Sequence, residues 1–145
     1  MTSAAVEALV RAGRLERVVA DREAARSKVE EAQRHLGSAS RIAKDDPAGA
    51  YALLYDAARK AIHAHMLASG LRATNRAGAH DAVGRYAEAV FSRTKHRDAV
   101  SRFDRMRRNR NRSEYGSWHI GASTVAADLG HAKAIVDAVG SKIGG

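Results

Sequence analysis

Apolar residues recur at alternating spacings of three and four along most of this chain, which is the period of an amphipathic helix. One stripe predicts a helix over roughly residues 22–43, and a second predicts a helix that begins at Asp46-Pro47 and ends near Ser69-Gly70. An aspartate followed by a proline is typical of an N-cap and the first helical position. The short link predicts that the two helices form an antiparallel hairpin. The stripes consist of Ala25, Val29, Ala32, Leu36 and Ala39, then Tyr51, Leu54, Ala58, Ala61, Ile62, His65 and Met66.

The remainder of the chain is also predicted to be mainly helical. Residues 70–79 have loop composition and precede a third helix, and a fourth begins near Thr94 and is ended by Gly116 and Gly121. A further helix is predicted around residues 3–12, and no strand pattern or repeat is evident. The inward positions are Val83, Tyr86, Ala87 and Val90 in the third helix, Val100, Phe103 and Met106 in the fourth, and Val125, Leu129, Ala132, Val136, Val139 and Ile143 in the last.

These elements predict an all-α protein, an up-and-down bundle of four to five long helices. The length of 145 residues suits a single domain over residues 1–145, with 1–13 as an extra N-terminal helix. The closing Ser-Lys-Ile-Gly-Gly should be frayed, with 144–145 as its tail.

Composition narrows the class of protein. Hydrophobic residues make up 45% of the chain, which suffices for a core, and the absence of cysteine excludes disulfides and thiolate sites. The N-terminus has neither a basic segment nor an apolar segment of a signal peptide, and no apolar run approaches 18 residues. We therefore expect a soluble, cytoplasmic protein without membrane contact.

Metal and cofactor chemistry are not expected. None of the seven histidines has another at the i, i+4 spacing of a helical metal pair, and no Gly-rich phosphate loop occurs. The adjacent carboxylates Glu30-Glu31 and Asp45-Asp46 are expected on a helix surface and at a helix cap. His65 lies on an inward stripe, where a hydrogen-bonded core histidine is expected.

Positive charge concentrates in one segment. Residues 93–112 hold nine basic side chains against Asp98 and Asp104, so they carry +7 of the formal net charge of +9. A focused arginine array would meet a phosphate backbone or another highly anionic partner first. The alternative is an ordinary solvated helix face. Candidate nucleic-acid-binding residues are Arg102, Arg105, Arg107, Arg108 and Arg112.

The end of this arginine-rich helix holds candidate catalytic residues. Arg108, Asn111 and Tyr115 lie at i, i+3 and i+7 and share a helix face. A guanidinium binds phosphate and stabilises charge developing on its oxygens, and Asn can position a ribose hydroxyl or a phosphate oxygen. A tyrosine with a pKa of about 10 is a poor base unless the arginines depress that pKa. The alternative is that Tyr115 is a core aromatic residue.

Near the end of the arginine-rich helix, Arg110 is followed directly by the polar Asn111, and then by Tyr115, in the pattern Arg110-Asn111-x-x-x-Tyr115. Other distinctive segments are Gly13-Arg-Leu-Glu-Arg-Val18, Ala32-Gln-Arg-His-Leu-Gly-Ser-Ala39 and Tyr51-Ala-Leu-Leu-Tyr-Asp-Ala-Ala-Arg-Lys-Ala-Ile62. In these segments and in its helix order, the chain resembles the HEPN domain superfamily of α-helical bundles, in bacterial toxin–antitoxin or defence form, over roughly residues 14–143. The family motif is an Arg, a polar residue directly after it, and a His within four to six residues, so Arg110-Asn111-x-x-x-Tyr115 is the best register, with Tyr115 at the histidine position. Arg108 with Tyr115 and Arg112 with His119 are two further registers.

The resemblance implies a metal-independent endoribonuclease whose site forms across a homodimer interface, with a cognate antitoxin or a nucleotidyltransferase-type protein as a partner. Arg110 and Arg108 would bind the scissile phosphate of RNA, and Asn111 would orient it. Tyr115 would take the histidine's role or hold the hydroxyl, with His119 as the other candidate for the histidine's role. Members that lack the histidine are often non-catalytic RNA-binding or scaffold domains. The alternative function for this chain is a non-catalytic module whose arginine array contacts RNA, a nucleotide or an acidic partner protein. A third possibility is a structural helical dimerisation domain.

Overall fold

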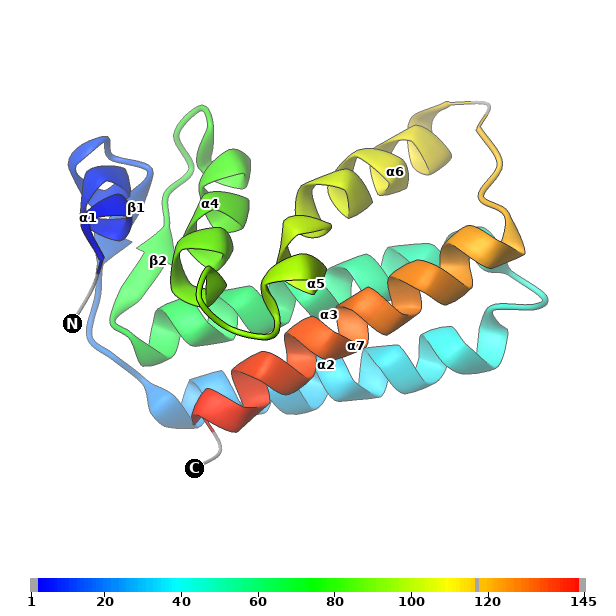
Figure 1. Ribbon diagram of the computed structural model, residues 1–145, viewed down its shortest axis with the longest axis horizontal. Coiled ribbons are helices and arrows are strands. Elements are labelled where there is room, and N and C mark those ends of the chain that lie inside the picture. The colour runs from blue at the N-terminus through cyan, green and yellow to red at the C-terminus, as the bar shows by residue number, and fades with distance from the viewer. Residues whose placement is uncertain (1–2, 117, 144–145) are drawn as a thin grey trace.

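The computed structural model describes residues 3–116 and 118–143, and most of them are helical (Figure 1), which confirms the predicted all-α class. The long helices α2, α3 and α7 lie side by side, and α2, α3, α6 and α7 alternate in direction along the chain. In chain order the elements are α1 (Ala4–Arg11), β1 (Leu15–Arg17), α2 (Arg22–Ile42), α3 (Pro47–Ala68), β2 (Leu71–Ala73), α4 (Ala79–Phe91), α5 (Arg97–Ser101), α6 (Phe103–Tyr115) and α7 (Ala122–Ile143).

Local signals determine where the two longest predicted helices begin. The Asp21 side chain accepts a hydrogen bond from the backbone N–H of Ala24 at 2.9 Å, and Asp46 accepts one from that of Gly49 at 3.0 Å. Each carboxylate satisfies an N–H group that the first helical turn leaves without a partner. Pro47 occupies the first turn of α3 as predicted. α2 and α3 form the expected antiparallel hairpin.

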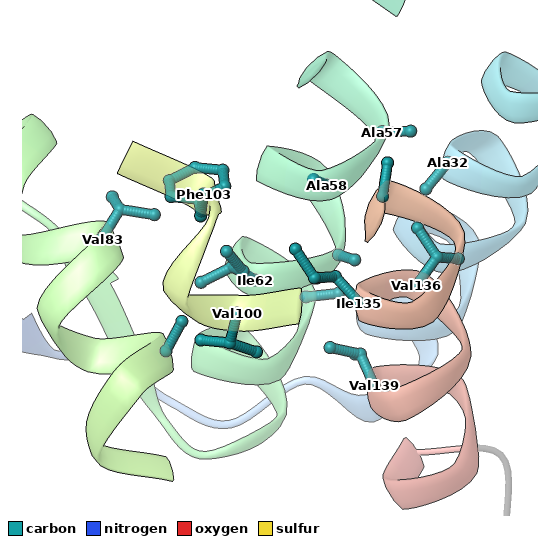
Figure 2. Close-up of a cluster of buried hydrophobic side chains, with 14 of the residues drawn as sticks. Ala32, Ala57, Ala58, Ile62, Val83, Val100, Phe103, Ile135, Val136 and Val139 are labelled. Atoms are coloured by element: carbon teal, nitrogen blue, oxygen red, sulfur yellow. The ribbon is translucent and has the colours of Figure 1, made fainter. Parts of the chain in front are cut away.

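The core lies between α2, α3 and α7 and extends under α5 and α6. Small side chains, among them Ala32, Ala57 and Ala58, are fully buried where the long helices approach one another. Larger side chains such as Ile62 and Phe103 fill the wider space toward α4, α5 and α6 (Figure 2). The predicted inward positions are buried, except that Leu36, His65, Val90 and Leu129 are only partly buried.

A small sheet corrects the prediction that the chain has no strands and that residues 70–79 form a loop. β1 and β2 pair antiparallel, with Leu15 opposite Ala73 and Arg17 opposite Leu71. Each strand has three residues, too few to display an alternation of period two. Gly70 turns the chain into β2 with a φ of 75°, a conformation that costs glycine little.

The predicted fourth helix is two helices, α5 and α6, and it begins at Arg97 rather than near Thr94. At Arg102 the backbone has φ −85° and ψ −11°, and its N–H donates to the carbonyl of Ala99 in a tighter i, i+3 turn. Gly116 ends α6 as predicted.

The chain's last helix differs from the expectation of a frayed tail. α7 continues to Ile143, whose side chain is buried, so the prediction of fraying was wrong for residues 141–143. Residues 144–145 lie outside the described part of the chain. No helix within residues 3–116 and 118–143 is long and apolar enough to cross a membrane.

Candidate functional site

The arginines of α6 are divided between two faces of the helix. One face carries residues 107, 110 and 111, which line a groove between α6 and α3. The other face is solvent-exposed and is here called the outer face. It consists of Arg105, Arg108, Arg112 and Tyr115, at successive spacings of three or four residues. The helix therefore presents positive charge in two directions.

The groove has a volume of about 670 Å³ and carries arginines on both walls. Arg107, Arg110 and Asn111 come from α6, and Arg59 comes from α3 with Asp56 as its partner. Burial would raise the pKa of Asp56, but hydrogen bonds from Arg59 and Lys60 outweigh burial and hold that pKa below its usual value. Asp56 is therefore a carboxylate near neutral pH, and the remaining lining is Ala52, Leu53 and Tyr55.

Arg110 lies at the centre of the site. Its guanidinium sits 5.9 Å from the centre of the Tyr55 ring, and one terminal nitrogen is 3.3 Å from the Glu114 carboxylate. Its Nε is buried and has no hydrogen-bond partner within residues 3–116 and 118–143. The Arg110 side chain is 37% exposed, so its terminal N–H groups can also donate to an incoming anion beside the Glu114 ion pair.

A buried polar network holds α6 in place beside this groove. The Tyr51 hydroxyl donates to Oδ2 of Asp128 at 2.7 Å, and it accepts a hydrogen bond from Nδ2 of Asn109 at 3.2 Å. The other carboxylate oxygen of Asp128 is 3.0 Å from Nδ1 of His131. Burial and the bond to Asp128 raise the pKa of Tyr51, so the phenol stays protonated. The network joins α3, α6 and α7, and Asn109 positions α6.

Most of the cations in the segment 93–112 lack an acidic partner. Asp104 accepts hydrogen bonds from Arg107, at 3.0 Å to its terminal nitrogen, and from Arg108, while Arg110 pairs with Glu114. These three are the only ones of the nine that form an ion pair within the described chain. The six unpaired cations are Arg93, Lys95, Arg97, Arg102, Arg105 and Arg112, the last of which stacks 4.5 Å from the Trp118 ring centre.

The predicted catalytic residues are not gathered at one point. Arg110 and Asn111 line the groove, whereas Arg108 and Tyr115 lie on the outer face and His119 is exposed beyond Gly116. Tyr115 is 82% exposed, so the alternative of a core aromatic residue was wrong. Its hydroxyl makes no hydrogen bond within the part of the chain that the structure describes. Arg102 is exposed at the junction of α5 and α6.

Sequence reasoning missed the α3 wall of the groove, namely Tyr55, Asp56 and Arg59. A signal was present, because polar side chains at 56, 59, 60 and 63 recur at helical spacing on the face of α3 away from its apolar stripe. His65 was predicted as a hydrogen-bonded core histidine. The structure confirms a partner, since its Nδ1 is 2.6 Å from the Tyr86 hydroxyl.

The described residues offer no obvious metal centre: within 3–116 and 118–143, no group of three or more His, Asp or Glu side chains is arranged to hold a metal ion. Comparison with protein-family models, with curated proteins and with solved structures finds no match for this chain.

Proposed function

We propose that this chain is a HEPN-like protein that acts on RNA and that it binds RNA through α5, α6 and the adjoining groove. The observation that carries the proposal is the set of cations in residues 93–112, of which Arg102 and Arg105 are exposed and form no ion pair within the described residues. An exposed unpaired guanidinium gives up no intramolecular ion pair when it meets phosphate. An array of them lowers the free energy of binding through counterion release.

The groove adds side chains that can recognise the phosphate, ribose or base groups of RNA. Arg59, Arg107 and Arg110 offer guanidinium donors from two walls, and Asn111 offers an amide that can both donate and accept. Arginine forks match phosphate geometry, and an amide can pair with a ribose hydroxyl or a base edge.

Binding is tested by fluorescence anisotropy of a labelled single-stranded RNA over a series of salt concentrations. The double substitution Arg102→Gln, Arg105→Gln should weaken binding and flatten the log–log salt slope by about 1.4, since each lost phosphate contact removes about 0.7. The matched control is Arg34→Gln, Arg41→Gln, which removes two exposed arginines from α2. If the two double substitutions weaken RNA binding equally, the affinity depends only on the net charge of the protein. Absence of RNA binding at micromolar protein would overturn the proposal.

A second candidate function is metal-independent RNA cleavage at the outer face. It is favoured by the exposed phenol of Tyr115, which shares that face with Arg108 and Arg112. A phenol and guanidinium groups exposed together would be available to a second copy of the chain, and we infer a homodimer that pairs these faces. Charge stabilisation of the phosphate by an arginine would then assist attack of the ribose 2′-hydroxyl.

Cleavage is tested by incubating the protein with RNA in EDTA and analysing the products. Activity should leave a 2′,3′-cyclic phosphate and fail on DNA, which lacks the nucleophile. Tyr115→Phe removes one hydroxyl from an exposed ring, so loss of cleavage in a normally folded variant would assign the chemistry to the phenol. Tyr115→His should retain cleavage activity because imidazole titrates near neutrality. Sedimentation of a monomer at tens of micromolar would exclude a shared site.

A further inference from the structure

A second groove continues the first one along α3. It has a volume of about 500 Å³ and lies between α3 and the segment that follows β2. Tyr55 and Arg59 line both grooves, so the two spaces meet at these side chains. The two grooves therefore adjoin at Tyr55 and Arg59, the first bounded by α6 and the second by residues 73–77.

The far end of the second groove carries another free cation. Arg76 lines it and forms no ion pair within residues 3–116 and 118–143. The segment that bears Arg76 is anchored, because the Thr74 hydroxyl donates to the carbonyl of Gly13 at 2.8 Å and the Thr74 N–H donates to that of Arg14 at 3.0 Å. The Arg76 guanidinium also lies against Gly13, where a Cβ would collide with it. The backbone beside Arg76 is thus anchored at Thr74, and its side chain lines the groove.

Besides the arginines and the Asp56 carboxylate, the two grooves offer uncharged polar groups. The Tyr55 ring is nearly buried and stacks 5.4 Å from Phe103, centre to centre, yet its hydroxyl has no hydrogen-bond partner among the described residues. His63 lines the second groove, and burial, reinforced by Arg59 and Lys28, lowers its pKa to about 4. A neutral imidazole and a phenol hydrogen-bond to bases and ribose rather than to phosphate charge.

We propose that the two grooves form one path for a single-stranded RNA, with Arg107 and Arg110 binding phosphate at one end, Arg76 at the other, and Arg59 at the junction. This inference rests on the proposed RNA-binding function and names the form of RNA that the groove accepts. Each space is of the size that holds one small molecule or nucleotide, and polar side chains are part of its lining. A rigid duplex cannot lower individual nucleotides into such recesses, whereas a flexible single strand can.

The test compares Arg76→Gln with Arg34→Gln, an exposed arginine of α2 that lines neither groove. Anisotropy is measured with a labelled oligouridylate of about 12 nucleotides, one of about 4 nucleotides and an RNA hairpin, lengths within the range of single-strand sites. We expect Arg76→Gln to weaken binding of the long strand roughly fivefold and to lower its salt slope by about 0.7, with little effect on the short strand, which fills the α6 end alone. Arg34→Gln should change neither quantity.

The outcomes separate this inference from the function on which it rests. Equally tight binding of the hairpin and the long single strand would overturn the path. The path is also overturned if Arg76→Gln leaves the long strand's affinity and salt slope unchanged while the double substitution Arg102→Gln, Arg105→Gln weakens binding. In both cases the proposal of RNA binding stands. If the unsubstituted protein binds no RNA, both are overturned. Arg76 is exposed and unpaired among the described residues, so its substitution should leave the fold intact, which circular dichroism would verify.

Discussion

The substitution Tyr51→Phe tests whether the buried polar network holds α6 in place. Tyr51 is fully buried, its hydroxyl donates to Asp128 at 2.7 Å, and it accepts from Asn109 at 3.2 Å. Phenylalanine keeps the ring and its apolar packing, so the change removes little more than these two hydrogen bonds. The loss should appear in the free energy of unfolding and in the position of α6.

The expected size follows from the burial of the acceptor. Asp128 is 3% exposed, so its carboxylate cannot replace the lost partner with bulk water and retains only His131 at 3.0 Å. Hydrogen bonds to charged groups contribute about 1.5–3 kcal/mol, and Asn109, which is partly exposed, can regain a water molecule. We expect a loss of about 2 kcal/mol, which lowers Tm by about 6 °C for a chain of this length.

Urea and thermal denaturation followed by circular dichroism would measure this loss. The control Tyr115→Phe removes the same hydroxyl from a ring that is 82% exposed and should change the free energy of unfolding by less than about 0.5 kcal/mol. A double-mutant cycle with Asp128→Asn should show coupling above about 0.5 kcal/mol. If Tyr51→Phe is as stable as the control, the network does not hold α6 and the reasoning fails.

Three further predictions concern stability and can be measured by urea denaturation. Stability should fall as pH is lowered from about 6.5 to 4, since burial lowers the pKa values of His63 and His65 to about 4 and only the unfolded chain takes up protons there. The slope should reach up to about 1.4 kcal/mol per pH unit for each histidine, and His63→Leu should flatten it. Gly70→Ala should cost about 1–2 kcal/mol, because φ is 75° and the added Cβ lies 3.0 Å from a backbone oxygen, whereas Gly121→Ala meets nothing within 4 Å. Ala58→Leu should cost about 1–3 kcal/mol by overpacking a fully buried position, and no loss would indicate unfilled space there.

The long helices could be predicted because each displays several turns of the same apolar period and begins at a recognisable cap. The small elements could not. β1 and β2 are three residues each, and their pairing joins positions 54–58 residues apart, such as Leu15 and Ala73. The break at Arg102 was hidden because Val100, Phe103 and Met106 all face the core at helical spacing on both sides of it. The period of the apolar residues indicates which side of a helix is buried, but it does not indicate whether the helix axis bends.

The candidate site was predictable only as far as it lies on one helix. The concentration of arginine is a property of the sequence, and so is the spacing of Arg110 and Asn111. Which face meets α3 depends on tertiary packing, so Arg59 and Tyr55 were missed and Tyr115 could not be assigned to core or surface. The HEPN resemblance, RNA binding, catalysis and the homodimer stay predictions that the proposed experiments address.

The way α6 is held connects the stability of this protein with its proposed binding function. Only Phe103 and Met106 of this helix are buried apolar residues. Its later turns are held by the hydrogen bond of Asn109 to Tyr51 and by cation–π contacts of Arg110 and Arg112. The groove lies between this helix and α3, so its shape depends on those contacts rather than on a deep apolar interface. Tyr51→Phe should therefore lower stability and RNA affinity together, although it removes no charge, whereas the Arg102 and Arg105 substitutions should lower affinity alone. RNA that binds only the folded chain should in turn raise its stability by mass action, and by less in Tyr51→Phe at the same RNA concentration.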